Sequence, residues 1–166
     1  MSMKKLMLIL IACLIVACTQ QKASEIAPDE ILGMSKLWEK GGEEALESVM
    51  KSHIGDIRFV EDVAIAGYGK EKKSVTLWIT TYPNSSTAKI ETERMAEAMM
   101  YFEDWGKYLK KEKVDGTEVY STLRYARHYF WSNGYCMFYI IPRNLNESEI
   151  KIIIESLKCG GFSWQN

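Results

Sequence analysis

Residues 117–141 place the strongest constraint on the fold, because aromatic side chains recur along this stretch almost without interruption. The chain holds 9 Tyr, 5 Phe and 5 Trp residues, and 8 of these aromatic residues lie between positions 120 and 139. Aromatic residues favour strands, and the dipeptide Asn133-Gly134 is typical of a two-residue hairpin turn. The stretch therefore predicts two or three adjacent strands that pair antiparallel.

The two faces of this predicted hairpin differ from those of an ordinary surface ribbon. A two-residue turn at the dipeptide places Trp131 opposite Cys136. The same register sets Tyr129 opposite Phe138. Both faces then carry apolar or aromatic side chains, whereas a half-buried antiparallel ribbon has one polar face. Either helices cover both faces, or one face binds a ligand or a partner protein. In the second case the expected contact residues are Tyr125, Tyr129 and Trp131.

The rest of the chain alternates between helix and strand patterns. Apolar residues recur every three or four positions in helices and at every second position in strands. Helices are expected at 28–40, 43–53, 87–105 and 146–159, strands at 57–67 and 74–82, and a charged loop at 107–116. Asn146 and Glu149 match a capping box at the start of the last helix. The order ααββαβββα predicts an α+β fold, with an antiparallel sheet of about five strands flanked by helices.

The first 17 residues have the composition of an export signal. Lys4 and Lys5 precede an apolar run at 6–17, which ends in small residues. A membrane-spanning helix needs about 20 apolar residues, so the run is short for an anchor. A positive start, a short apolar core and a small-residue end are typical of a secretory signal. A plain secretory peptide and a short transmembrane anchor are the alternatives.

The end of the run, Ile15-Val16-Ala17-Cys18, resembles the lipobox of prokaryotic lipoprotein precursors. The resemblance covers residues 1–18 and implies that a diacylglycerol is joined to the Cys18 thiol and that the chain is cut just before it. The chain then divides into a signal peptide at 1–17, a lipidated cysteine and tether at 18–27, and a single α+β domain at 28–166. The implied location is the outer side of the cytoplasmic membrane, or the outer membrane if the host has one.

Charge gives no reason to expect a nucleic-acid partner. The chain has 21 Lys and Arg against 22 Asp and Glu, a formal net charge of −1. Loss of Lys4 and Lys5 with the signal leaves 19 basic residues against 22 acidic ones, a net charge of −3. Such a surface is not drawn to anionic lipid, so the membrane contact is expected to come from the two acyl chains, which hold a protein firmly where one does not.

The four cysteines are sorted by location. Cys13 leaves with the signal and Cys18 carries the lipid, which leaves Cys136 and Cys159 in a compartment that often permits oxidation. A strand that runs on from Cys136 and a helix that returns to Cys159 cover similar lengths of about 20 Å. The two thiols are therefore expected to form a disulfide, with two buried free thiols as the alternative.

No familiar catalytic or metal-binding motif occurs in the sequence. His53 lies on the apolar stripe of a predicted helix and His128 in an aromatic strand, whereas a zinc site needs three or four closely spaced ligands. Met95 and Met99 lie four apart on a predicted helix, where packing in the core is expected more than binding of Cu(I). No cofactor is expected.

The favoured interpretation is a membrane-anchored, non-enzymatic binding or accessory domain with a protein or small-molecule partner. Two alternatives stay open. One is an enzyme of unknown reaction that uses His53 or His128 with acidic residues. The other is a carrier of a metal ion or haem.

Overall fold

The structure is a computed structural model that describes residues 21–52 and 57–159. Its strands are β1 (Glu30–Ile31), β2 (Met34–Gly41), β3 (Asp62–Lys70), β4 (Lys73–Thr81), β5 (Lys110–Val114), β6 (Thr117–Arg124), β7 (Ala126–Asn133) and β8 (Cys136–Arg143). Its helices are α2 (Ala23–Ile26), α3 (Gly42–Ser52), α4 (Ser85–Met100), α5 (Glu103–Gly106) and α6 (Glu147–Ser156).

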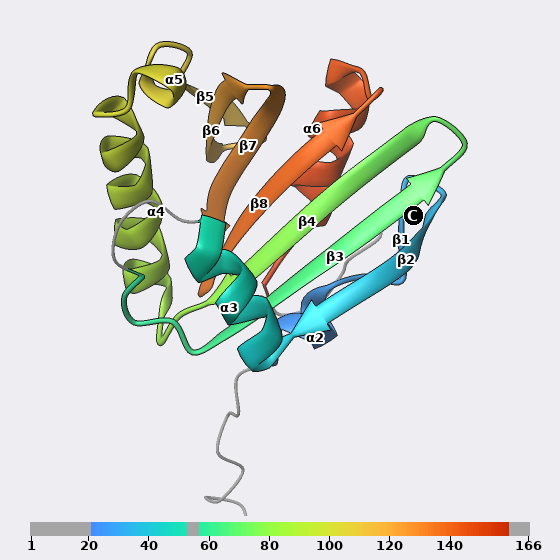
Figure 1. The fold of residues 1–166 in the computed structure, drawn as a ribbon, viewed down its shortest axis with the longest axis horizontal. Coiled ribbons are helices and arrows are strands. Elements are labelled where there is room, and N and C mark those ends of the chain that lie inside the picture. The colour runs from blue at the N-terminus through green and yellow to red at the C-terminus, as the bar shows by residue number, and fades with distance from the viewer. Residues whose placement is uncertain (1–20, 53–56, 160–166) are drawn as a thin grey trace, which may run out of the picture.

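The strands form one antiparallel sheet in the spatial order β1-β2-β3-β4-β8-β7-β6-β5, with helices on both faces (Figure 1). The buried apolar residues of α2 and α6 pack on one face, and those of α3 and α4 pack on the other. The expected α+β class and antiparallel sheet are confirmed. The described residues form eight strands rather than about five, and they contain five helices.

The helix expected at 28–40 is wrong, because this segment forms the hairpin of β1 and β2. Leu32 and Gly33 link the two strands with φ angles of 51° and 73°. A type I′ turn needs a positive φ at both central residues, and glycine adopts it without steric cost. Pairing of β2 with β3 then outweighs the helical spacing of the apolar residues.

The charged loop expected at 107–116 is also wrong in part, because Lys110–Val114 form β5. This strand lies at the edge of the sheet and pairs only with β6. Its first four residues, all Lys or Glu, are exposed. Charged side chains on an edge strand discourage pairing with a second chain, which explains why a strand here has the composition of a loop.

The hairpin of β7 and β8 forms, but its register differs from the expected one by two residues. Asn133 pairs with Cys136, and Trp131 pairs with Phe138. The two loop residues are therefore Gly134, whose φ is 56°, and Tyr135. Glycine at the first central position is typical of a type II′ turn. A shift of two residues leaves every side chain on its expected face.

The largest apolar core lies between the sheet and α6. Trp131, Phe138 and Ile140 contribute to it from the sheet, and Ile153 and Ile154 from α6. The start of α6 has the expected capping box: the Asn146 side chain accepts a hydrogen bond from the Glu149 amide, and the Glu149 carboxylate accepts one from the Asn146 amide. The apolar contacts of this core place α6 on the sheet face that carries Cys136.

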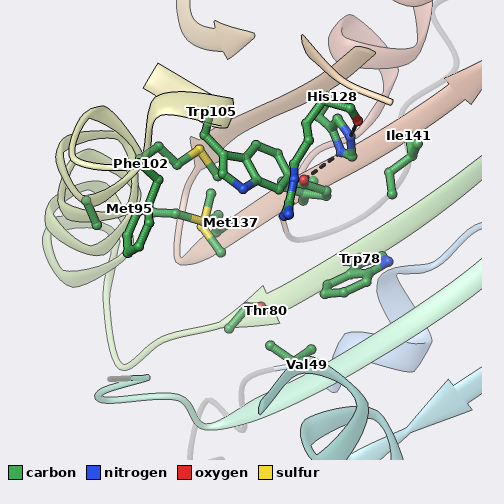
Figure 2. Close-up of a pocket in the computed structure, with 13 residues that line it drawn as sticks. Val49, Trp78, Thr80, Met95, Phe102, Trp105, His128, Met137 and Ile141 are labelled. Carbon is green, nitrogen blue, oxygen red and sulfur yellow. Dashed lines mark hydrogen bonds between the residues drawn. The ribbon is translucent and has the colours of Figure 1, made fainter. Parts of the chain in front are cut away.

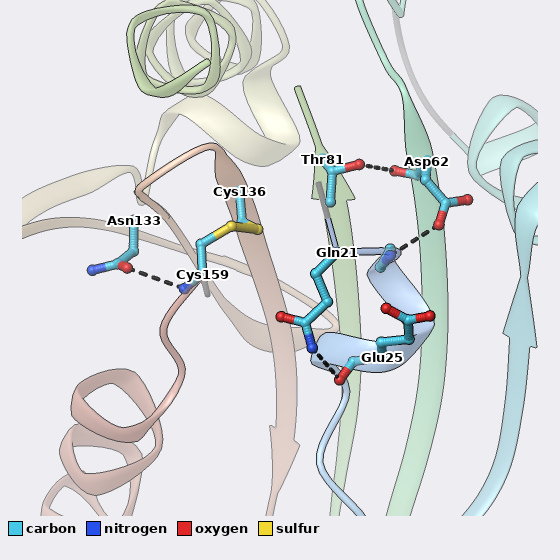
Figure 3. The surroundings of a disulfide bond; sticks show 8 residues. Gln21, Glu25, Asp62, Thr81, Asn133, Cys136 and Cys159 are labelled. Carbon is cyan, nitrogen blue, oxygen red and sulfur yellow. Dashed lines mark hydrogen bonds between the residues drawn. A yellow bond between two sulfur atoms is a disulfide. The ribbon is translucent and has the colours of Figure 1, made fainter. Parts of the chain in front are cut away.

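The expected disulfide between Cys136 and Cys159 is confirmed, with 5.6 Å between the two Cα atoms (Figure 3). It joins the first residue of β8 to the segment that follows α6. The Asn133 side chain accepts a hydrogen bond of 3.2 Å from the Cys159 amide beside it. The β7–β8 turn and the end of the α6 segment are therefore linked twice.

Part of the tether expected at 18–27 is folded. Ala23, Ile26 and Ala27 are buried in the core between the sheet and α6. The Ala23 amide donates a hydrogen bond of 2.9 Å to the Asp62 carboxylate at the start of β3 (Figure 3). The folded domain thus begins closer to Cys18 than the expected boundary at residue 28, while Cys18 itself lies outside the described residues.

Candidate functional site

A cavity of about 290 Å³ opens on the face of the sheet opposite the disulfide. On this face α3 packs on β2 and β3, and α4 packs on β7 and β8. The centre of the sheet between the two helices stays uncovered, so side chains of β4 and β8 form a floor there (Figure 2). The volume is close to the lower end of the range for small-molecule sites, about 300–1,000 Å³.

The floor follows from strand alternation. Trp78 and Thr80 of β4 point to this face, whereas their neighbours Leu77 and Ile79 are buried in the other core. Met137, Tyr139 and Ile141 of β8 alternate in the same way. The walls come from the helices and from the neighbouring strands β6 and β7: Val49, Met95, Ala98, Met99, Phe102, Trp105, Arg124 and His128.

His128 lies at one side of the cavity with both ring nitrogens engaged. Nε2 is 3.0 Å from the backbone oxygen of Arg124, and Nδ1 is 2.7 Å from the hydroxyl of Tyr139 (Figure 2). A carbonyl oxygen only accepts, so Nε2 carries the proton and donates it, and Nδ1 of the neutral ring accepts from the Tyr139 hydroxyl. Burial of the ring, and to a lesser degree the charge of Arg124, lowers the pKa of His128. Burial therefore favours the neutral form of the ring.

Among the described residues, Arg124 is the only charged one that lines the cavity. Its guanidinium carbon lies 5.1 Å from the ring centre of Trp105 and 5.4 Å from that of Tyr125. Its Nε atom is buried and donates no hydrogen bond. Within the described part of the chain no carboxylate forms an ion pair with Arg124, and no Asp or Glu lines the cavity.

The indole N–H groups of Trp78 and Trp105 are also buried without a hydrogen-bond partner, and both residues line the cavity. Trp105 is held in place through its backbone, since its carbonyl oxygen accepts a hydrogen bond of 2.6 Å from the Thr122 hydroxyl. Its ring also meets the edge of His128, with the ring centres 5.0 Å apart. Most buried polar groups in proteins have partners, so three unpaired donors around one cavity are unusual.

This arrangement is suited to binding rather than to proton transfer. The cavity wall is mainly apolar, and the polar atoms without partners on it are hydrogen-bond donors. A general base needs a free acceptor near its substrate, whereas the acceptor atom of His128 already holds the Tyr139 hydrogen. Thr80 and the unpaired donors can orient a ligand that offers acceptor atoms.

The structure separates the residues that the sequence suggested as contacts. Trp131 and Tyr129 belong to the core beneath α6, so the face that they share is covered and offers no open surface. Tyr125 is 98% exposed at the turn between β6 and β7, next to Arg124. His53 and Cys18 lie outside the described residues.

Sequence reasoning missed Arg124, Trp105 and Trp78 as members of a site. Two local signals were present: an arginine beside Tyr125 in an aromatic stretch, and a tryptophan that shares one face of β4 with two threonines. Neither signal identifies a site alone, because the residues meet only when four strands and three helices are assembled. Met95 and Met99 were expected in the core, and they both contact the core under α4 and line the cavity.

Comparison with protein-family models, with curated proteins and with solved structures finds no match to this chain. Among residues 21–52 and 57–159, no cluster of three or more His, Cys, Asp or Glu side chains is arranged to hold a metal ion. The helices in these two segments include none that is both long and apolar enough to cross a membrane.

Proposed function

We propose that the chain is a lipoprotein anchored on the outer side of the cytoplasmic membrane, or in an outer membrane, and that it binds a small apolar molecule in the cavity between α3 and α4. The observation that carries the binding part is an apolar cavity of which three lining residues, Trp78, Trp105 and Arg124, hold buried donors without partners. The lipobox resemblance at Ile15–Cys18 supports the anchored location. The domain is a binding module and not an enzyme.

The engaged ring of His128 supports binding over catalysis. Both of its nitrogens hold groups of the protein, and the charged side chain that acts on its pKa is the cation Arg124 rather than an acid. An acid–base pair of the kind that the enzyme alternative requires would need a carboxylate at the cavity, and the described residues supply none there.

The cavity is also poorly suited to a metal ion or haem. Met95, Met99 and Met137 bring three thioethers to its wall, and Cu(I) prefers such soft ligands. The positive charge of Arg124 would repel any cation placed beside them. Haem is too large, because the volume is about twice that of a 150 Å³ cavity that holds benzene.

Saturable quenching of tryptophan fluorescence by bromobenzene tests the binding part. Bromobenzene is small and apolar, and its bromine quenches an indole that it touches, so Trp78 and Trp105 report its entry. The full chain, held in phosphatidylcholine nanodiscs, is expected to show a saturable component that Ala98→Phe removes by filling the cavity.

The matched control is Ile90→Phe, which adds an aromatic ring to an exposed position of the same helix. It is expected to leave the saturable component unchanged. Quenching that rises linearly in all three proteins would mean that no binding cavity exists and would refute the proposal.

A further inference from the structure

We infer that the cavity takes an amphipathic anion, a molecule with one carboxylate held beside Arg124 and an apolar body of roughly a dozen non-hydrogen atoms. This inference rests on the proposed function and adds the chemical class of the ligand. It is argued in turn from the charge at the cavity wall, from the unpaired donors and from the shape of the apolar part.

The charge at the wall is positive and uncompensated. Arg124 is charged at every physiological pH, its Nε atom is buried, and the described residues offer it no carboxylate. A partly buried charge without a counter-charge is costly. Aromatic rings at 5.1 Å and 5.4 Å stabilise the guanidinium, while its Nε atom still has no hydrogen-bond partner. An anionic group on a ligand would supply the missing partner, and a carboxylate matches the planar fork of an arginine in shape.

The donors near this charge point to an acceptor on the ligand. The Trp105 ring lies against the Arg124 guanidinium, and its indole N–H is buried without a partner. Neither indole nor guanidinium can accept a hydrogen bond. The nearby N–H of His128 is already donated to the Arg124 carbonyl oxygen, so it does not compete for the ligand. A carboxylate has enough lone pairs to satisfy both free donors at once.

The remaining wall suits a flexible hydrocarbon body. Met95, Met99 and Met137 have unbranched, polarizable side chains that adapt to irregular shapes. Trp78 and Phe102 add flat apolar surfaces on different sides, as Figure 2 shows. A volume about twice that of a cavity for benzene accommodates a medium-length chain and excludes a long diacyl lipid. Medium-chain fatty acids and arylalkanoic acids fit this description.

Three probes that differ only in their head group test the inference: nonanoate, nonanamide and nonylammonium. Each is measured by equilibrium dialysis against the full chain in phosphatidylcholine nanodiscs, with empty nanodiscs as the blank for lipid partition. We expect nonanoate to bind about tenfold or more tightly than nonanamide, because a hydrogen bond to a charged group contributes more than a neutral one. We expect nonylammonium to bind most weakly of the three.

The decisive variant is Arg124→Gln, with Arg127→Gln as its control. Both remove one positive charge from the same pair of strands, but Arg127 is exposed and does not line the cavity. Arg124→Gln is expected to weaken nonanoate binding about tenfold and to change nonanamide binding less than about threefold. Arg127→Gln is expected to change neither. Thermal unfolding by circular dichroism checks that both variants fold.

The outcomes separate this inference from the proposed function. If nonanoate and nonanamide bind equally, and Ala98→Phe abolishes the binding of both, the inference that the ligand is an anion would be overturned. The proposed apolar binding site would remain supported. Equal weakening of nonanoate by Arg124→Gln and Arg127→Gln would also overturn it, since only general charge would then be at work. Failure of all three probes together with bromobenzene would overturn both proposals. If Arg124→Gln did not fold, the comparison of nonanoate with nonanamide on the unaltered chain would still decide the question.

Discussion

Arg124 and His128 belong to one short network in which backbone and side chain have separate roles. The Arg124 carbonyl oxygen accepts the His128 N–H, while its guanidinium faces the cavity. His128 in turn accepts the Tyr139 hydroxyl hydrogen. The imidazole therefore joins the turn before β7 to β8 and keeps Tyr139 in place on the floor of the cavity. Burial lowers the pKa of His128, so this network depends on a neutral ring.

The free energy of unfolding is expected to decrease as the pH is lowered, because of this histidine. Its pKa in the unfolded chain is about 6.5, and its pKa in the folded chain is lower. Below about pH 6.5 the unfolded state binds a proton that the folded state does not, so the free energy of unfolding falls as the pH falls toward the folded-state pKa. The melting temperature should therefore drop more between pH 7.5 and pH 5.5 in the unaltered chain than in His128→Gln.

The comparison of the two proteins isolates His128, because His53 and all carboxylates are present in both. An equal drop in melting temperature would show that the ring is already protonated in the folded chain, or that its environment does not lower its pKa.

At the scale of elements, the β7–β8 turn and the segment after α6 form one unit. Asn133 stays in β7 and uses its side chain to hold the Cys159 amide, and the disulfide joins the same segment to Cys136. A Cβ atom at Gly134 would lie 3.0 Å from the Cys159 Cβ, so this glycine serves both the turn and the close approach. The segment after α6 is thereby linked to the sheet face that carries the largest core.

Reduction of the disulfide is expected to lower the free energy of unfolding by about 3 kcal/mol, from the loop-entropy model for residues 23 apart in sequence. Urea denaturation with and without dithiothreitol measures the change. The double variant Cys136→Ala, Cys159→Ala should not respond to dithiothreitol. Bromobenzene quenching of the reduced protein should be unchanged, because the cavity lies on the other face of the sheet. A reduced protein as stable as the oxidised one would contradict the prediction.

Local patterns predicted the elements that have regular apolar alternation or a capping box. The strand expected at 74–82 is β4 at Lys73–Thr81, and the last helix has its capping box. The patterns failed where pairing with a distant strand decided the outcome, as in β2, which has helical spacing but pairs with β3. The β7–β8 register differs from the expected one, and in it the Asn133 side chain bonds the Cys159 amide, a distant contact that the dipeptide rule does not include.

The candidate site could not be predicted in the same way. Its residues come from β4, β6, β7, β8, α3 and the α4–α5 region, with at most three from any one strand or helix. Periodicity placed Trp78 and Thr80 on one face of their strand but did not show that this part of the face stays uncovered. The gap between α3 and α4 is a property of the assembled sheet. Only Tyr125, among the suggested contacts, lies at the surface near Arg124.

At the scale of the whole molecule, the sheet separates two regions of different character. One face is sealed by α2, α6 and the disulfide, and the other holds an apolar cavity between α3 and α4. The sealed face supplies the rigidity, since its core extends across the whole sheet from β1 to β5. The other face can therefore keep an open volume without loss of the fold.

Lipidation of the whole chain is expected at Cys18. Expressed in a bacterial host, the chain should lose residues 1–17, and intact-mass spectrometry should find a mature chain that begins with a diacylglyceryl-modified Cys18. Cys18→Ala should remain an unprocessed precursor, whereas Cys13→Ala should be processed normally, because Cys13 lies in the segment that is removed. A mature chain with an unmodified end elsewhere would refute the anchored location.

The folded start of the domain near Gln21 determines how an anchored copy would stand. Two residues lie between Cys18 and Gln21, so three peptide steps join them, a reach of about 10 Å at most. Ala23 is bonded to Asp62, and pairing along β3, β4, β8 and β7 places Asp62, Thr81, Cys136 and Asn133 at one end of the sheet. Arg124 and Tyr125 lie at the opposite end, where β6 turns into β7. An anchored copy would thus keep its Asp62 end close to the lipid head groups and hold Arg124 at the height of the full strand length above them, facing the space outside the membrane.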